Sequence, residues 1–306
     1  MNKVIILLGP TGVGKTGVSI LLAKAMHTEI ISADSMQIYR HMDIGTAKPT
    51  KKEMSIVRHH MIDIVEPSET FSTGKYIEQV VPIIERLHRE GKIPIIAGGT
   101  GLYLKAMTRG IFSGPSADWT LREELLGKEK LDRGSLFTSL RSLDPDTASR
   151  VMPSDTRRII RALEVCLKTK TGISELQKNF TRPLPYEFVR IGLTMERKEL
   201  YGLIEKRVDA MLGRGLLEEV RDLLLMNPGR TALQAIGYKE LLSFLSGDIP
   251  MDEAVRLIKK RSKAYAKRQF TWFRREEGIH WLDVSGLLSS EKVHEAIEIF
   301  LGNRLT

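Results

Sequence analysis

Short runs of apolar and β-branched residues recur along the chain and are separated by segments with helical periodicity. The runs are KVIILL near the amino terminus, then EIISAD, MIDIV and IPIIAGG, and much later FVRIGLTM and IHWLDV. Strands buried in parallel sheets have this near-continuous apolar character, and strands that alternate with helices are typical of a sheet covered on both faces. The pattern therefore predicts an α/β fold with a parallel sheet flanked by helices.

A long stretch without a strand pattern separates the fourth run from the fifth. Here DWTLREELLGKEK, RGSLFTSLRSL, PDTASRVM and SDTRRIIRALEVCLKTKTG each have helical character. In the last segment, Ser154 or Asp155 is the expected N-cap and Gly172 the expected stop. We therefore predict a core formed by residues 1–111 and 186–306, and an all-helical insertion over 112–185. The core is expected to resume with helices near 198–212, 216–225, 238–245 and 252–273.

The first apolar run leads directly into GPTGVGKT. This stretch matches the phosphate-loop spacing G-x-x-x-x-G-K-[ST], in which glycines let backbone N–H groups curl around an anion. The lysine can place its ammonium on a phosphate oxygen, and the threonine hydroxyl can ligate Mg²⁺. A helix that begins at the lysine adds the positive end of its dipole. The predicted phosphate site comprises Gly9, Pro10, Thr11, Gly12, Val13, Gly14, Lys15 and Thr16. The loop alone leaves open whether ATP, GTP or another diphosphate binds.

The second run ends in SADSMQIY. Because the carboxyl ends of parallel strands face the ligand crevice, we expect Asp34 to lie beside the phosphate loop. A carboxylate there could bind metal-bound water or act as a general base. The alternative is that Asp34 caps the segment that follows it.

Two further motifs lie at the fourth and third strands of the predicted core. In GGTGLYLKA, Gly98 and Gly99 permit close backbone approach, and Thr100 opens a helix whose N-terminal amides could meet the same anion. A plain strand-to-helix turn with Thr100 as N-cap fits these residues equally well. In HHMID, adjacent histidines on an extended segment point to opposite faces, which favours a polar-network role over joint metal ligation.

Size and charge restrict the function classes. The 306 residues carry a net charge of +9 with a pI near 9.5, which favours a polyanionic partner. The single cysteine, Cys166, excludes an internal disulfide framework. No apolar stretch is long enough to cross a bilayer and no secretion signal is recognisable, so we expect a cytoplasmic protein.

The most basic segment, Arg256–Arg275, carries nine lysines and arginines and no acid. On a helix, Arg256, Lys260, Lys263 and Lys267 fall along one stripe. A merely solvated face would interleave acids, so this stripe predicts contact with a phosphate backbone or a leaving diphosphate.

A second basic cluster opens the last helix of the insertion. Arg157 and Arg161 lie one turn apart, beside Arg158, and could grip neighbouring phosphates. Arg161 could instead pair with Glu164 in the same helix.

Several of these stretches together resemble one family. GPTGVGKT, SADSMQIYR, GTAKP, HHMID, GGTGLYL, RRIIRALEV, QAIGYKEL and AYAKRQFTWFR are similar to motifs of the bacterial tRNA dimethylallyltransferases, and they occur in the family's order. The resemblance runs from Gly9 to Arg274. It implies a P-loop NTPase-like transferase core with a helical insertion that contacts the anticodon stem-loop of tRNA.

The resemblance also implies an activity. Such an enzyme transfers the dimethylallyl group of dimethylallyl diphosphate to N6 of the adenosine 3′-adjacent to the anticodon, in tRNAs that read codons beginning with U. The phosphate loop would then hold a diphosphate leaving group, and no ATP need be hydrolysed. Mg²⁺ is the implied cofactor, bound at Thr16, and the enzyme is expected to act as a monomer without membrane association.

Residue roles follow from the same resemblance. It assigns Asp34, Thr100 and Arg207 to the reaction centre, with Arg207 on the diphosphate. It places a flipped adenine in a channel. The residues expected to contact tRNA are Asp34, Ser35, Met36, Gln37, Thr100, Arg122, Arg157, Arg158, Ile159, Ile160, Arg161, Lys267 and Arg268. Many relatives carry Thr-Arg where this chain has Ser262 and Lys263, and lysine cannot make the bidentate phosphate contact of arginine.

Two other functions are compatible with a phosphate loop. A small-molecule P-loop kinase would need lid arginines that close over ATP, and it would not need the basic carboxyl-terminal helix. A nucleic-acid-stimulated ATPase would need an apolar strand that ends in Asp-Glu, which this chain lacks. SADSMQIY and QAIGYKEL favour prenyl transfer over both, by resemblance.

Overall fold

The computed structural model describes residues 2–112, 114–286 and 289–305. The chain divides into two compact units, one formed by Met1–Leu104 with Pro185–Thr306 and the other by Lys105–Leu184. The second unit begins earlier than the predicted 112, because helix α4 (Gly101–Arg109) carries the chain across the division. No helix in the described part of the chain is both long enough and apolar enough to cross a membrane.

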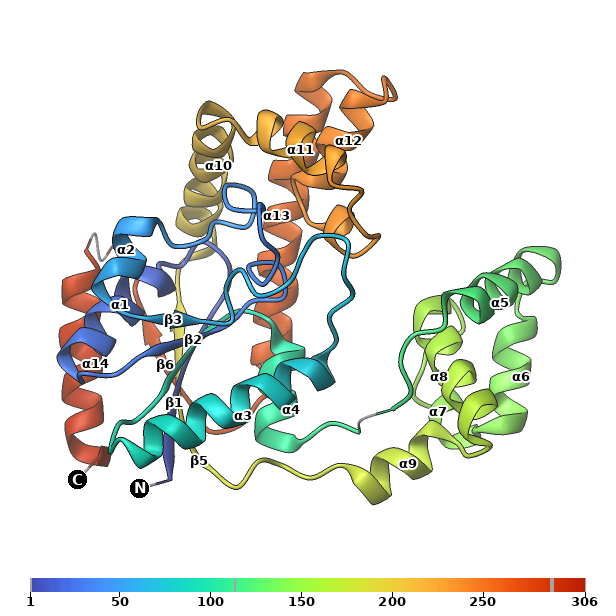
Figure 1. Ribbon diagram of the computed structural model, residues 1–306, viewed down its shortest axis with the longest axis horizontal. Helices are drawn as coiled ribbons and strands as arrows, with labels where there is room; N and C mark the ends of the chain where they lie inside the picture. Colours follow the sequence, from blue (N-terminus) through green and yellow to red (C-terminus); the bar gives the residue numbers. More distant parts are fainter. Residues whose placement is uncertain (1, 113, 287–288, 306) are drawn as a thin grey trace. The chain divides into compact units, whose positions relative to one another are not determined.

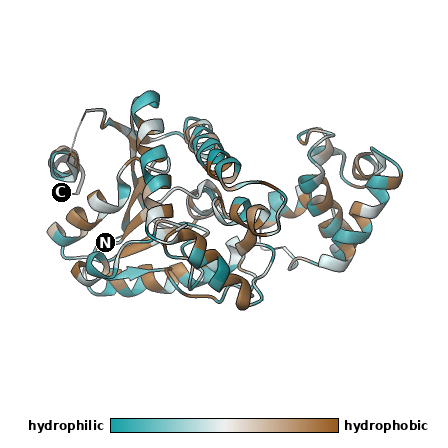
Figure 2. Ribbon diagram, turned by 90° about the horizontal axis from the view of Figure 1, so that it is seen from above, coloured by the Kyte–Doolittle hydropathy of each residue, from teal (hydrophilic) through white to brown (hydrophobic). Residues whose placement is uncertain are grey.

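A six-stranded parallel sheet forms the centre of the first unit, with helices on its faces (Figure 1). The strands lie in the order β3-β2-β4-β1-β5-β6, and β1 pairs with both β4 and β5. Their bounds are β1 Lys3–Leu8, β2 Ile30–Ala33, β3 His59–His60, β4 Ile95–Gly98, β5 Glu187–Thr194 and β6 Ile279–Asp283. The strands are among the most hydrophobic parts of the molecule in Figure 2. The predicted α/β fold is confirmed.

The third strand differs from its prediction. The ladder holds His59 and His60, which pair with Ile30 and Ile31, whereas MIDIV follows it as irregular chain. Met61 has a φ of 62° in that segment, and this left-handed backbone turns the chain out of the ladder. Met61 and Val65 of MIDIV are buried, and Val65 forms only an isolated bridge with Tyr39.

Register places the carboxyl ends of the central strands together. Leu8 at the end of β1 is level with Gly98 of β4 and Gly192 of β5, and Gly98 is level with Ala33 of β2. The segments that follow β1, β2 and β4 therefore leave the sheet at the same end, that of the strand carboxyl termini, where a ligand crevice is expected.

Helices surround this sheet and extend the first unit. Their bounds are α1 Lys15–Ala25, α2 Lys51–Ile56, α3 Thr73–Arg89, α10 Arg197–Gly213, α11 Leu216–Leu225, α12 Tyr238–Leu245, α13 Met251–Phe273 and α14 Ser290–Leu305, with a 3₁₀ turn at Ala232–Gln234. One apolar cluster lies around β1, β5, α1 and α14, and a second joins α10–α13 to the chain after β2. The four helices predicted between 198 and 273 are confirmed to within two residues.

The second unit is helical, as expected. Its helices are α5 Trp119–Leu131, α6 Ser135–Leu143, α7 Pro145–Ala148, α8 Thr156–Thr169 and α9 Ile173–Phe180. Asp155 is the N-cap of α8 and accepts a hydrogen bond from the Arg158 N–H at 3.2 Å. The expected stop at Gly172 was wrong. Lys170, at φ 59°, already ends α8, and Gly172 begins α9.

Candidate active site at the phosphate loop

The phosphate loop leaves β1 and enters α1, which begins at Lys15 as predicted. Gly12 and Gly14 have φ values near 90°, a left-handed backbone that side chains with a Cβ rarely adopt. The Lys15 Nζ donates hydrogen bonds to the carbonyls of Gly9 at 3.0 Å and Pro10 at 2.8 Å. The ammonium therefore lies over the loop, where a phosphate group would find it.

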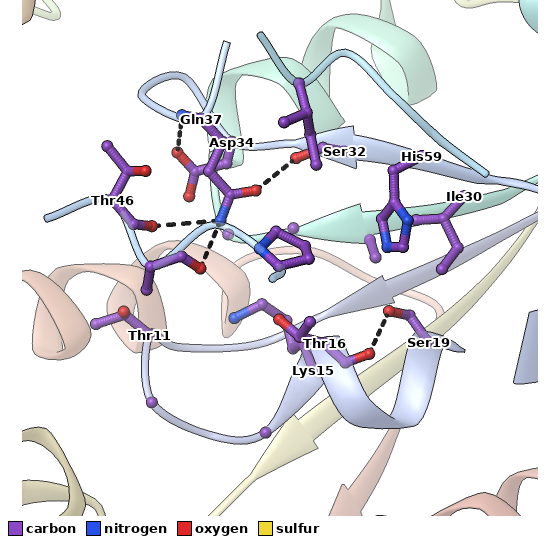
Figure 3. A pocket seen from close by; sticks show the side chains of 18 of the residues that line it. Thr11, Lys15, Thr16, Ser19, Ile30, Ser32, Asp34, Gln37, Thr46 and His59 are labelled. Carbon is purple, nitrogen blue, oxygen red and sulfur yellow. Dashed lines mark hydrogen bonds between the residues drawn. The ribbon is translucent and has the colours of Figure 1, made fainter. Parts of the chain in front are cut away.

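A cavity of about 300 Å³ opens above this loop. Figure 3 shows two groups of side chains that face each other across it, Thr11, Lys15 and Thr16 from the loop side, and Asp34, Gln37 and Thr46 from the segments after β2. A second cavity of about 290 Å³ adjoins it and shares five lining residues with it. These are Thr11, Asp34, Thr46, Ala47 and Arg207. The two cavities therefore meet at Asp34 and Arg207.

Asp34 follows β2 and lies beside the phosphate loop, as predicted. Its Oδ1 accepts hydrogen bonds from the backbone N–H groups of Met36 at 2.8 Å and Gln37 at 3.3 Å. The capping alternative is therefore also correct, because one carboxylate both caps the turn and lines both cavities. These two bonds hold the Oδ1 oxygen of the carboxylate in place beside the cavities.

Two cations face Asp34 from the loop side and from α10. Burial lowers the pKa of Lys15 to about 8, while Asp34 acts to raise it and Arg207 to lower it further. Burial also lowers the pKa of Arg207, and Asp34 opposes this shift. Both shifts show that the cations are held in a site of low polarity, where an anion would interact with them strongly.

Arg207 has an unmet hydrogen-bonding capacity. Its Nη2 donates to Thr11 Oγ1 at 2.7 Å, whereas its buried Nε has no partner among the residues that the structure describes. Buried donors are rarely left unpaired in proteins, so this atom indicates a place for an acceptor. Arg207 lies in the middle of α10, and residue patterns alone give no signal for it.

Gln269 of α13 is a site residue that sequence reasoning missed. Its Oε1 accepts from the Thr11 N–H at 2.7 Å, and its Nε2 donates to the Gly99 carbonyl at 2.9 Å. A Cβ at Gly99 would lie 2.2 Å from Gln269 Nε2, so the glycine permits this approach. The buried amide ties the phosphate loop to the turn between β4 and α4.

Thr100 lies directly after that turn. Its Oγ1 accepts from the Ser35 N–H at 3.0 Å, and Tyr265 hydrogen-bonds to the threonine side chain. The Thr100 carbonyl accepts from the N–H groups of Tyr103 and Leu104, so the residue also starts α4. It is not among the residues that line the two cavities. Thr100 joins the segments after β2 and β4, and its place at the reaction centre stays a prediction.

The other SADSMQIY residues divide into two groups. Ser35 and Met36 line the second cavity. The Gln37 amide is engaged by the protein at both ends, because its Oε1 accepts from Ser32 and its Nε2 donates to the carbonyls of Thr46 and Ala47. Gln37 therefore holds the loop at 46–47 while it lines the first cavity, and its contact with tRNA stays a prediction.

The two adjacent histidines have separate partners. His60 Nε2 lies 2.6 Å from Glu29 Oε2, which also binds Arg86, and His59 Nδ1 lies 2.8 Å from the Val57 carbonyl. The polar-network interpretation is confirmed. In the part of the chain that the structure describes, no group of three or more histidines, cysteines and acids is placed to hold a metal ion.

The basic stripe of α13 is opposed by acids at two of its four positions, and its contact with a phosphate backbone or diphosphate stays a prediction. Arg256 pairs with Glu253 in the first turn of the same helix at 2.6 Å, and Lys263 pairs with Glu205 of α10 at 2.5 Å. Both acids lie outside Arg256–Arg275: Glu253 precedes it on α13, and Glu205 lies on α10. Lys267 and Arg268 are exposed, and Arg268 also lines the second cavity.

In the second unit, the fully buried carboxylate of Glu164 accepts hydrogen bonds from two of the arginines expected to bind RNA. Arg122 donates to both Glu164 oxygens, at 2.9 and 2.7 Å, and Arg161 donates to Oε2 at 2.5 Å. The alternative pairing of Arg161 with Glu164 is therefore correct. Both arginines remain partly exposed, at 25% and 35% of their side-chain surface.

The remaining residues of this group differ in accessibility. Arg157 is exposed, and Arg158 is exposed beside Asp155 at 3.3 Å. The side chains of Ile159 and Ile160 are only 2% and 9% exposed and pack in the core of the unit. These side chains form part of the apolar face of α8, and the predicted contact of the two residues with tRNA stays a prediction.

Comparisons with known proteins agree on one family. A family model described as IPP transferase matches residues 37–276. The tRNA dimethylallyltransferase of Thermodesulfovibrio yellowstonii is 58% identical over 303 residues, which cover 97% of this chain and 96% of that one. The tRNA dimethylallyltransferase of Acetivibrio thermocellus is 42% identical and covers 98% of both chains.

Solved structures are similar over the same length. The tRNA isopentenylpyrophosphate transferase of Bacillus halodurans superimposes with a TM-score of 0.74 at 40% identity, over 100% of this chain and 97% of that one. A eukaryotic dimethylallyltransferase acting on tRNA gives a TM-score of 0.81 at 30% identity, over 99% of this chain and 80% of that one. The chain belongs to the IPP transferase family.

Proposed function

We propose that the protein transfers the dimethylallyl group of dimethylallyl diphosphate to N6 of the adenosine 3′-adjacent to the anticodon, in tRNAs that read codons beginning with U. The products are N6-(dimethylallyl)adenosine and diphosphate. One observation carries the proposal: Asp34 lies where the phosphate-loop cavity meets a second cavity of similar size. The first suits the diphosphate donor, and the second suits the acceptor base. The names of the relatives supply the substrate class.

The reaction needs a base at that junction. The N6 lone pair attacks C1 of the dimethylallyl group, a C–N bond forms, and the bond between C1 and the diphosphate oxygen breaks with its electron pair on the diphosphate. Adenine N6 is a poor nucleophile because its lone pair is delocalised into the ring. Asp34 takes the N6 proton as the C–N bond forms, and its carboxylate is held for this by the N–H groups of Met36 and Gln37.

The leaving diphosphate concentrates negative charge that fixed donors must stabilise. Lys15 can exchange the carbonyls of Gly9 and Pro10 for phosphate oxygens, and the unpaired Nε of Arg207 can donate to the same group. The loop amides after Thr11 add further donors at the start of α1. These groups are in place before charge develops, which is the condition for electrostatic stabilisation of a leaving group.

Mg²⁺ fits this donor set through Thr16. The Thr16 hydroxyl lines the cavity, and the described residues offer no cluster of three or more metal-binding side chains. Mg²⁺ is usually held by one or two protein oxygens together with substrate phosphates, so a protein cage is not required. When bound, the ion neutralises charge on the diphosphate.

We further propose that the unit Lys105–Leu184 binds the anticodon stem-loop. Arg122, Arg157, Arg158 and Arg161 are its contacts to the RNA backbone, and their partly or fully exposed guanidinium groups support this role. Lys267 and Arg268 are proposed RNA contacts on the first unit. We expect a monomer that acts in the cytoplasm.

Label transfer tests the activity directly. The purified protein, Mg²⁺, unmodified tRNA and radiolabelled dimethylallyl diphosphate are mixed without ATP, and label in the RNA is counted. Asp34→Ala is expected to lose at least about 100-fold in kcat, within the range for loss of a general base, while it still binds diphosphate. Asp248→Asn, an exposed substitution in a turn after α12, serves as the control. Transfer of the γ-phosphate of ATP or ATP hydrolysis, without label in tRNA, would refute the proposal and favour a kinase or an ATPase.

A further inference from the structure

Two motifs that the proposed chemistry does not use, GTAKP and QAIGYKEL, meet at one carboxylate. Glu219 of α11 accepts hydrogen bonds from three successive backbone N–H groups, those of Asp43 at 2.8 Å, Ile44 at 2.7 Å and Gly45 at 3.0 Å. The same carboxylate accepts from the Tyr238 hydroxyl at 2.5 Å. Four donors from two distant segments therefore converge on one side chain.

These two segments are walls of the second cavity. The loop contributes Gly45, Thr46 and Ala47 to its lining, and the chain before Tyr238 contributes residues 234–237. Tyr238 is fully buried, and a Cβ at Gly45 would lie 2.3 Å from its ring. The glycine thus lets the two walls touch, and Glu219 fixes them at that spacing.

The loop is secured on its other side as well. Lys48, whose side chain is 3% exposed, donates to the Tyr39 carbonyl and to Asp43 Oδ1, both at 2.6 Å, and also binds Asp63. Ala47 has a φ of 53°, a backbone conformation that a non-glycine residue keeps only when its surroundings enforce it. The loop is therefore held in one conformation, and Glu219 supplies the contact that sets its distance from α11 and α12.

We propose that Glu219 is a positioning residue that sets the width of the second cavity and so the placement of the acceptor base against Asp34. This proposal rests on the proposed function. In the described part of the chain, the hydrogen bonds of Glu219 end on the two cavity walls and none reaches the phosphate loop. Loss of the contact should therefore affect the step that needs the acceptor base and leave diphosphate binding intact.

Glu219→Gln tests the proposal with little change in volume. A glutamine presents an NH₂ group to donors that need an acceptor, so at least one of the bonded N–H groups loses its partner and the loop must shift. A displacement of about 1 Å at a reacting group can cost about 100-fold in rate. Tyr238→Phe removes a single hydroxyl from the same carboxylate and keeps the ring. Glu218→Gln is the matched control, since Glu218 is the exposed neighbour that pairs with Arg221 at 3.8 Å.

The readouts are kcat for dimethylallyl transfer to tRNA, the Kd of inorganic pyrophosphate with Mg²⁺, and the melting temperature. We expect Glu219→Gln to lower kcat by about 10- to 100-fold and to leave the pyrophosphate Kd within about twofold. Tyr238→Phe should lower kcat by a smaller factor of at least about threefold, and Glu218→Gln should match the unchanged protein.

An unchanged kcat in Glu219→Gln, or a loss of pyrophosphate affinity as large as the loss in kcat, would overturn the positioning role. If Glu219→Gln does not fold, Tyr238→Phe decides between the same two outcomes. An unchanged protein that does not label tRNA at all would refute the proposed function, and this proposal with it.

Discussion

Replacement of Gln269 by leucine should separate the phosphate loop from the turn after β4. The Gln269 amide bonds the Thr11 N–H at 2.7 Å and the Gly99 carbonyl at 2.9 Å, and the residue is only 6% exposed. Leucine has a similar size but cannot bond either group. Both backbone groups therefore lose the bond that joins the phosphate loop to the turn.

The magnitude follows from these two contacts. An unsatisfied buried polar group costs about 1–3 kcal/mol, so the pair costs about 2–6 kcal/mol. Burial of the leucine side chain offsets about 2 kcal/mol. The net loss in the free energy of unfolding of the first unit is then between about 0 and 4 kcal/mol, with a midpoint of about 2 kcal/mol. A less ordered loop should also weaken pyrophosphate binding by about tenfold, which corresponds to about 1.4 kcal/mol.

Tryptophan fluorescence can follow the first unit alone. The chain has three tryptophans, of which Trp119 lies in the second unit, whereas Trp272 and Trp281 lie in the first. Urea unfolding is therefore measured in a Trp119→Phe background, and pyrophosphate affinity by calorimetry. Gln79→Leu, at an exposed position of α3, controls for the loss of an amide. The reasoning is refuted if the free energy of unfolding of Gln269→Leu lies within about 0.5 kcal/mol of that of the unchanged protein and its pyrophosphate affinity is also unchanged.

Two further predictions concern charge. Burial lowers the pKa of Lys15 to about 8, so the ammonium loses its proton as pH rises through that value, and pyrophosphate affinity should fall by up to about tenfold per pH unit above 8 but not below it. The Lys15→Arg protein is measured alongside, because pyrophosphate itself titrates equally in both experiments. An equal dependence of affinity on pH in the two proteins would contradict the prediction. Hydrogen bonds from Arg122, Arg161 and the Asp118 N–H outweigh burial and lower the pKa of Glu164. In a Trp272→Phe, Trp281→Phe background, Glu164→Gln should cost the second unit about 1–3 kcal/mol in urea unfolding followed by Trp119 fluorescence, whereas exposed Glu124→Gln should cost almost nothing.

The parts of the site that could be predicted from sequence are those fixed by local spacing. The phosphate loop depends on glycines two and five positions apart, and helix α1 starts at Lys15 because the loop ends there. The position of Asp34 follows from a general property of parallel sheets, in which the carboxyl ends of neighbouring strands lie at the same end of the sheet. Neither inference needed the identity of any residue distant in the chain.

The charges of α13 show why the rest could not be predicted. Periodicity places Lys263 on one stripe of the helix, but its partner Glu205 lies 58 residues earlier on α10. The partner of Arg256 is Glu253, which precedes the basic segment by about one turn and so does not appear in its composition. A pattern within one segment gives the face on which a charge lies, and only the packing of helices shows which charges oppose it.

Buried polar residues carry a signal that sequence does contain. Along α13 the buried positions are 254, 258, 262, 266, 269 and 273, so the helical period places Gln269 in the same stripe as Ile258 and Phe273. A polar side chain in an apolar stripe is costly unless it is bonded, so its position alone indicates an internal partner. The fold then supplies the partner: the phosphate loop for Gln269 and the cavity walls for Glu219. The period of a helix can therefore indicate a buried polar residue such as Gln269, whereas the segment that it contacts depends on topology.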